Sequence, residues 1–187
     1  MTVSVSRLWE TAAFMGVDVP LVVVRDVEHA TPLQILRLRA GQRVKLPYPY
    51  ALALLREGCA ELDPEGLPGH STLKKLSWAE EKTEELQPLE EGFYLKVALL
   101  ASSLRERARR GDEGAEESLR KLRIALADLV RLRSLKIAQL ASKNPAPSRE
   151  KMKNMTLEEQ ILYVNLCELL SSWMKALVSL ATGGEKA

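Results

Sequence analysis

The most informative segment of this sequence is TLEEQILYVNLCELLSSWMKALVSL, residues 156–180. It opens with a capping box, in which the Thr156 hydroxyl and the Glu159 carboxylate can satisfy each other's free backbone N–H groups, so a helix is predicted to begin here. Its apolar residues cover much more than the single stripe that one flank of a helical bundle needs. They are Ile161, Leu162, Leu166, Leu169, Leu170, Trp173, Met174, Leu177, Val178 and Leu180.

The excess apolar surface of this helix has two explanations. In the first, part of it meets another protein chain, because large apolar patches mark association sites. In the second, the helix lies centrally among its neighbours and buries both sides within the chain. The two explanations differ over four side chains, which form a subunit interface in the first and bundle core in the second. These are Trp173, Met174, Leu177 and Val178.

The sequence before this helix is also helical as far back as residue 70. Ser71 can cap a first helix that runs to about Glu84. A second is predicted to open at Pro88 and to be broken by the glycines at 111 and 114, and a third to span residues 115–142. The third helix would be about 40 Å long at about 1.5 Å per residue, which is long for a small bundle and favours a partner.

Residues 1–69 follow a different pattern, with β-branched clusters and six of the nine prolines. Short strands are predicted, with one helix among them that Gly58 ends. The expected strands are 20–25, 33–38, 44–46 and 59–62, and the helix is 50–56. The core of this region is predicted at Val22, Val24, Leu46, Leu52 and Leu55.

Pro and Gly turn residues in the segment 63–69 predict a linker between the two regions. The expected fold class is therefore α+β and mostly α, with a small N-terminal strand-rich domain followed by a C-terminal helical bundle. The predicted domains are residues 1–66 and residues 70–187.

The composition is that of a folded soluble protein. Apolar residues make up 46% of the 187, and 27 Lys and Arg against 25 Asp and Glu leave a net charge of +2, which excludes a strongly basic DNA-coating protein. Cys59 and Cys167 each lie among apolar neighbours, which favours reduced thiols in an intracellular compartment over a disulfide. Neither a signal peptide nor a membrane span is predicted.

The residue types that catalysis requires are scarce. His29 and His70 are the only histidines, so neither a histidine metal site nor a Ser–His pair is predicted. No phosphate-binding loop or paired Cys motif occurs. Adjacent glutamates such as Glu158 and Glu159 are expected to complement helix starts, because neighbours on a helix point about 100° apart and do not converge. We therefore predict no catalytic, metal-binding or cofactor-binding residue and no enzymatic activity.

Positive charge is concentrated along the third predicted helix and the loop after it, from Arg120 to Lys153. Such a surface can hold DNA or an acidic partner through phosphate or carboxylate contacts, although no aromatic residues are interleaved to stack bases. The candidate contact residues are Arg131, Arg133 and Lys136. The alternative is that these side chains are solvated or pair with acids of neighbouring helices.

Two segments carry a resemblance to a known family. GQRVKLPYPYALALLREG, residues 41–58, is similar to a signature in which a strand ends in Leu-Pro, an aromatic-bearing helix follows and a Gly closes it. MTLEEQILY, residues 155–163, resembles the segment that opens the last helix of a helical domain. Both are motifs of the GINS complex, the scaffold of the archaeal and eukaryotic replicative helicase. Tyr48 and Tyr50 depart from that family, which usually has a Trp or similar residue in this region.

The resemblance implies a non-catalytic scaffold subunit of the archaeal, small-domain-first type. Such a subunit assembles with a helical-domain-first GINS subunit and a second copy of itself into a 2:2 heterotetramer. It bridges the MCM helicase to a RecJ-like nuclease and stimulates unwinding, in a cytoplasmic, nucleoid-associated replisome, with at most weak DNA contact and no membrane. Two other interpretations compete, a DNA-binding regulator that uses the basic residues from Arg120 to Lys153 and a small enzyme built on a helical bundle.

Overall fold

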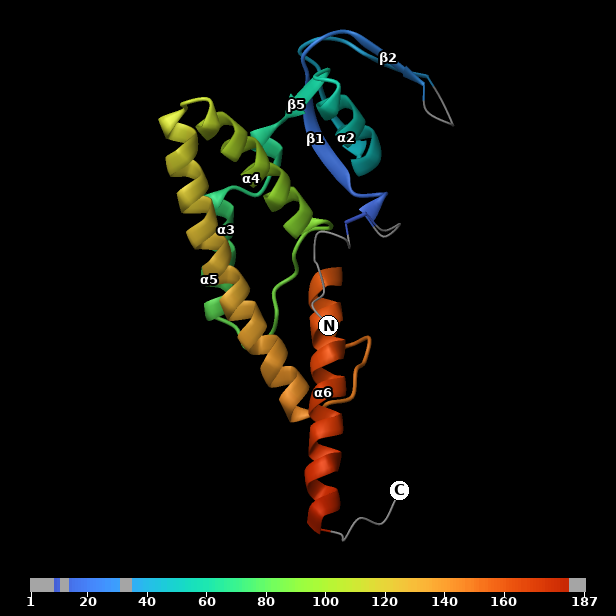
Figure 1. Cartoon of the computed structure of the whole chain (residues 1–187), viewed down its shortest axis with the longest axis vertical. Coiled ribbons are helices and arrows are strands. Elements are labelled where there is room, and N and C mark those ends of the chain that lie inside the picture. The colour runs from blue at the N-terminus through green and yellow to red at the C-terminus, as the bar shows by residue number, and fades with distance from the viewer. Residues whose placement is uncertain (1–8, 11–13, 31–34, 182–187) are drawn as a thin grey trace. The chain divides into compact units, whose positions relative to one another are not determined.

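The computed structural model describes residues 9–10, 14–30 and 35–181. Its elements follow in the order β1 (Asp18–Val23), β2 (Val27–Ala30), β3 (Ile35–Leu38), β4 (Arg43–Pro47), α2 (Tyr48–Arg56), β5 (Ala60–Leu62), the 3-10 turn η2 (Pro64–Gly66), α3 (His70–Glu81), α4 (Phe93–Arg109), α5 (Glu113–Lys143) and α6 (Leu157–Ala181) (Figure 1). The predicted fold class, strand-containing at the N-terminus and helical thereafter, is confirmed.

The chain divides into two compact units. The first combines Met1–Leu73 with Glu91–Ile124, and the second combines Lys74–Glu90 with Ala125–Ala187. The helix α5 therefore contributes residues to both units. The domains predicted from the sequence, 1–66 and 70–187, are divided at a different place from these two units. That domain division stays a prediction.

The sheet of the first unit is antiparallel, with the strand order β4-β1-β5, and β2 pairs with β3 in a hairpin that the sequence pattern did not predict. The central strand β1 buries Val19, Leu21 and Val23. Val22 is only half-buried and Val24 is exposed, so the predicted core is wrong there by one residue. Side chains of a strand alternate between faces, and a shift of one residue exchanges them all.

The rest of the first core agrees better with the prediction. Leu46 is buried, and Leu55 is partly buried against the same cluster. On α2 the buried positions are Ala51 and Leu54, whereas the predicted Leu52 is half-buried. Cys59 is buried here and Cys167 in the second unit, and neither forms a disulfide.

In the second unit, the C-terminal part of α5, the helix α6 and the segments before α4 and before α6 form a separate core. Its buried residues are Leu86, Ile137, Ala141, Met155, Tyr163 and Cys167. The capping box that opens α6 is confirmed. The Thr156 backbone N–H donates to Glu159 Oε2 over 3.0 Å, and the Glu159 backbone N–H donates to Thr156 Oγ1 over 3.4 Å. The helix therefore begins where the sequence predicts.

The helix α4 begins at Phe93 and not at Pro88, so its predicted start is wrong by one turn or more. Gly92 stands immediately before it with φ +66°, a left-handed conformation that favours glycine. A Cβ on Gly92 would lie 2.3 Å from Val17 Cγ1, and Val17 is itself buried. Both backbone conformation and close packing therefore require glycine at the entry to α4.

Replacing Gly92 by Ala should lower the free energy of unfolding by about 2–4 kcal/mol, because it adds overlap with Val17 to left-handed strain. Gly111→Ala is the matched control, since Gly111 also has positive φ but nothing lies within 4 Å of the position that its Cβ would take. The control should lose about 1–2 kcal/mol. Urea unfolding of both variants measures the difference, and equal losses would contradict the packing role of Gly92.

Candidate interaction surface

A buried cluster of charges joins the three helices of the second unit. Arg133 of α5 is only 1% exposed, and its guanidinium pairs with Glu80 of α3 and Glu159 of α6. The pair with Glu159 is bidentate, with Nε–Oε1 at 2.6 Å and Nη2–Oε2 at 2.7 Å. Lys136 Nζ donates to the second oxygen of Glu80 over 2.5 Å. We call these four side chains the ion cluster.

Backbone carbonyls complete the hydrogen bonding around this cluster. The segment between α3 and α4 presents three successive carbonyl groups, which accept from Lys136 at residue 85, from Asn154 at residue 86 and from Arg133 at residue 87. Arg133 also donates to the carbonyl oxygen of Asn154 over 2.8 Å. All five N–H donors of the guanidinium thus have an acceptor, as a buried arginine requires.

The ion cluster changes the interpretation of the basic residues. Of the three candidate contacts, Arg131 is exposed, Lys136 has a side chain 13% exposed and Arg133 is internal. Arg133 therefore does not belong to a surface that could hold DNA. Pairing with acids of neighbouring helices, the alternative drawn from the sequence, accounts for both Arg133 and Lys136.

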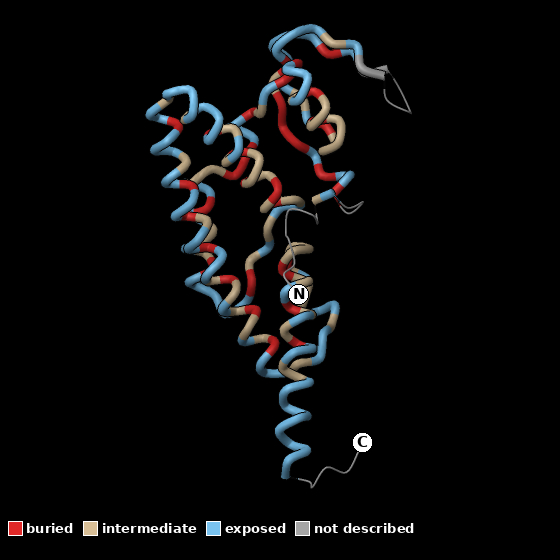
Figure 2. The backbone as a smooth tube through the Cα atoms, viewed as in Figure 1, coloured by how far each residue is buried: buried red, intermediate tan, exposed pale blue. Residues whose placement is uncertain are grey.

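The helix α6 has two halves of different character. In its first half one stripe packs inward, with Glu159, Tyr163 and Cys167 buried and Leu170 half-buried. The spacing of four and three residues continues along the same side to Met174 and Leu177. We call Tyr163, Cys167, Leu170, Met174 and Leu177 the inner stripe. Every residue from 172 to 181 is exposed (Figure 2). In this half of α6, no other part of the described chain packs over the inner stripe.

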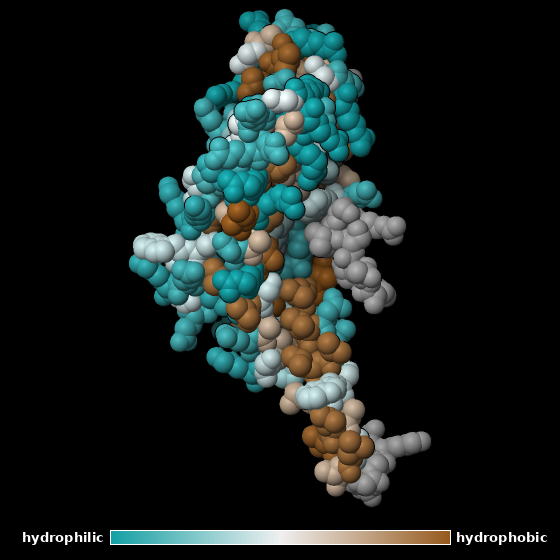
Figure 3. Space-filling model, turned by 60° about the vertical axis from the view of Figure 1, so that its left-hand side comes forward, coloured by the Kyte–Doolittle hydropathy of each residue, from teal (hydrophilic) through white to brown (hydrophobic). Residues whose placement is uncertain are grey.

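The four side chains of the expected interface all lie on the uncovered half. Trp173 is 59%, Met174 47%, Leu177 46% and Val178 63% exposed. The second explanation from the sequence, in which these four side chains form the bundle core of the same chain, is therefore wrong. Figure 3 shows hydrophobic side chains gathered along α6. Their use as an interface stays a prediction.

Within the described residues, α6 is the one helix long and apolar enough to cross a membrane by length and composition. Two observations favour a protein partner instead. The first half of α6 is held in the second core and carries the buried Glu159. The uncovered half, ten residues, spans about 15 Å, only half the thickness of a hydrocarbon core.

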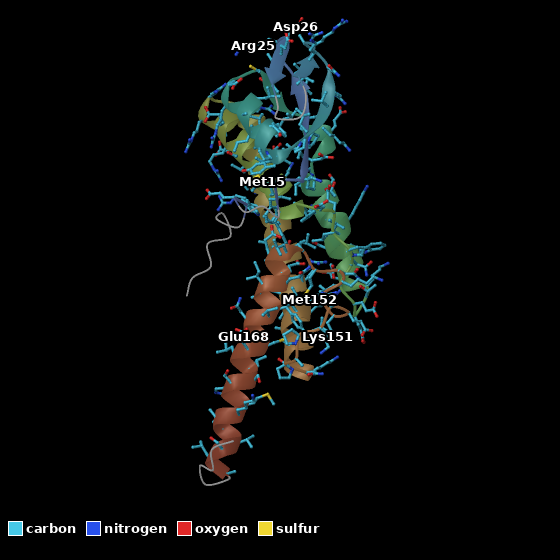
Figure 4. The ribbon with its side chains drawn as sticks, turned by 90° about the vertical axis from the view of Figure 1, so that its right-hand side faces the viewer. Met15, Arg25, Asp26, Lys151, Met152 and Glu168 are labelled. Carbon is cyan, nitrogen blue, oxygen red and sulfur yellow. The ribbon has the colours of Figure 1, made fainter. Side chains whose placement is uncertain are left out.

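The polar residues near α6 include Glu168, on the helix itself, and Lys151, in the loop before it. Figure 4 labels both, together with Met152 of the same loop. Met152 packs partly against the second core, and Lys151 Nζ donates to the carbonyls of Asn144 and Ala146, both over 3.4 Å. Among the described residues, no group of three or more His, Cys, Asp or Glu could hold a metal ion. The features that distinguish this region are thus the ion cluster and the uncovered stripe.

Removing the charge of Arg133 should destabilise the fold strongly. Arg133→Met leaves two buried carboxylates without their partner, and we expect a loss of about 3–5 kcal/mol in the free energy of unfolding. Arg131→Met, on the exposed side of α5, should change it by less than about 0.5 kcal/mol. Chemical denaturation compares the two. The double variant Arg133→Met/Glu159→Gln should recover part of the loss, and a mild effect of Arg133→Met would disprove the role of the cluster.

Tyr163 gives the second core a dependence on alkaline pH. Burial, together with the adjacent Cys167 thiol, raises the pKa of Tyr163 from 10.0 to about 12. The folded chain thus favours the neutral phenol, so this contribution to stability is complete below pH 10 and is lost as the pH rises towards 12. When the pH is raised from about 9 to about 11, the free energy of unfolding should fall less in Tyr163→Phe than in the natural chain, because phenylalanine has no proton to lose. Equal losses in urea unfolding would show that Tyr163 does not contribute.

Comparison with known proteins gives these features a family. The family model Sld5, the GINS complex protein helical bundle domain, matches residues 69–178, more than half of the chain. The matched range contains the whole ion cluster and the four uncovered side chains. A search of curated proteins finds no match. The chain belongs to the GINS family, and it is a subunit of the GINS complex of DNA replication.

Proposed function

We propose that this chain is a non-catalytic scaffold subunit of an archaeal GINS complex, of the small-domain-first type. Two copies assemble with two helical-domain-first subunits into a heterotetramer in the cytoplasmic replisome. The assembly bridges the MCM helicase to a RecJ-like nuclease and stimulates unwinding. The observation that carries this proposal is the inner stripe of α6, which is buried at Tyr163 and Cys167 and uncovered at Met174 and Leu177.

Continuity of the inner stripe indicates what covers it. Its first half packs against α5 and its neighbours as one seam of a helical bundle. The second half has the same spacing and the same apolar character, so a helix from another subunit can continue the bundle along it. Trp173 and Val178 lie on either side of the inner stripe and widen this surface. Tryptophan is among the residue types that most often dominate the binding energy of an interface.

The ion cluster gives this surface a fixed direction within the second unit. Glu159, in the first turn of α6, is bound to Arg133 of α5 and through it to Glu80 of α3. The helix therefore presents the inner stripe already ordered, and association does not have to fold it first. Preorganisation of this kind raises affinity by lowering the entropic cost of binding.

Assembly should depend on the inner stripe and not on the polar side of α6. Met174→Glu places a charge in the covered seam, and we expect it to abolish co-assembly with a candidate helical-domain-first GINS subunit. Lys175→Glu is the matched control, because it introduces the same residue one position away on the polar side. Light scattering behind a sizing column should show a joint peak of about 80 kDa, four chains of about this size, for the natural chain and the control.

The two variants also define how the proposal fails. If Met174→Glu and Lys175→Glu both keep the joint peak, the inner stripe is not the interface. If the natural chain itself gives no joint peak, the heterotetramer is rejected. The bridging role has its own measurement. The purified heterotetramer should retain both an MCM ring and a RecJ-like nuclease on an affinity column, and retention of neither would reject the bridge.

A further inference from the structure

The segment from residue 143 to residue 153 joins the end of α5 to the loop before α6, and its positive charge is not balanced. Four basic residues and one acid, Glu150, leave it a charge of +3. We call this segment the basic loop. Three of its four cations are exposed, and their side chains form no hydrogen bond or ion pair with any other residue that the structure describes. They are Lys143, Arg149 and Lys153.

Positive charge elsewhere on the two longest basic stretches is paired or dispersed. The ion cluster takes up Arg133 and Lys136 within the fold. Exposed Arg123 and Arg131 lie eight residues apart on α5, about 12 Å along the helix, with Asp128 between them. Other basic residues of α4 and α5 pair with an acid nearby in the sequence, and these pairs are Arg107–Asp112, Arg110–Glu106 and Lys121–Glu117.

The fourth cation, Lys151, holds the basic loop in shape. Its Nζ donates to the carbonyls of Asn144 and Ala146, so it ties the second half of the loop to the first. Within the second half, the Met152 backbone N–H donates to the carbonyl oxygen of Ser148 over 3.2 Å. The exposed cations therefore belong to a folded loop, and binding does not have to order it first.

The other exposed residues of the basic loop indicate the class of partner. They are Asn144, Ala146, Pro147 and Glu150. A protein partner would be expected to meet large apolar or aromatic side chains at the centre of its contact, and the exposed part of the loop has none. Single-stranded nucleic acid would need aromatic rings to stack its bases, which the loop also lacks. The phosphate backbone of a duplex needs only cations.

We propose that the basic loop binds the phosphate backbone of duplex DNA without reading its sequence. Lys143, Arg149 and Lys153 supply the phosphate contacts, and Lys151 keeps the loop closed. This contact goes beyond the proposed scaffold of proteins. It uses only residues of this chain, so it does not depend on the heterotetramer.

The salt dependence of binding tests the number of contacts. Fluorescence anisotropy of a labelled 20-base-pair duplex, titrated with the full chain, measures the affinity. Three phosphate contacts predict a slope of about −2.7 for the logarithm of affinity against that of salt, so affinity should fall about 40-fold between about 50 mM and about 200 mM salt. Two duplexes of unrelated sequence should bind equally, because phosphates carry no sequence information.

A charge-matched pair of variants tests the location. Lys143→Gln/Arg149→Gln/Lys153→Gln should weaken binding at about 50 mM salt at least about tenfold and remove most of the slope. Lys74→Gln/Lys75→Gln/Lys82→Gln removes the same charge from exposed positions of α3. This control should stay within about threefold of the natural chain, because salt screens charges that do not touch the duplex. All six positions are exposed, so both variants should keep the circular dichroism of the natural chain.

Four outcomes would overturn the proposal. They are a loop variant that binds like the natural chain, equal losses in the two variants, tighter binding of a single strand than of the duplex, and displacement of the duplex by polyglutamate at equal charge concentration. The last of these would indicate an acidic protein partner instead. Co-assembly with a helical-domain-first subunit should be the same for the loop variant and the natural chain, so failure of DNA binding and failure of the proposed function can be told apart.

Discussion

The buried guanidinium of Arg133 is the group on which the second unit depends. A charge removed from water is costly unless it is paired and every donor is satisfied. Here the acceptors come from α3, from α6, from the segment before α4 and from the loop before α6. Four segments, each at least 21 residues from Arg133 in sequence, are thus fixed around its side chain. Moving any of them would leave a buried donor or carboxylate without a partner.

Hydrogen bonds around the ion cluster also hold the chain between α3 and α4. The carbonyls of residues 85–87 accept side-chain donors from α5 and from the loop before α6. Pro88 suggested a helix start, because proline fits the first turn. The helix α4 begins only at Phe93, directly after the left-handed turn at Gly92.

Features that depend on neighbouring residues were predictable from the sequence, whereas those that depend on distant ones were not. The capping box at Thr156, the glycine after α2 and the long span of α5 all follow from local spacing. Glu80 and Arg133 are 53 residues apart, and nothing in a local pattern pairs them. The sequence predicts a capping role for Glu159, which it has, and its carboxylate also binds Arg133. The core of β1 was missed because four consecutive apolar residues hide the alternation.

Local and distant interactions together explain how α6 can remain helical where nothing in the chain covers it. Forming the first turn is the costly step for a helix, and adding residues afterwards is cheap. The capping box and the ion cluster secure that first turn at Glu159. The uncovered half, rich in Leu, Met and Ala, can propagate from it without tertiary packing. A subunit built this way presents an ordered apolar helix before assembly, because the charge that orders it lies buried at the other end.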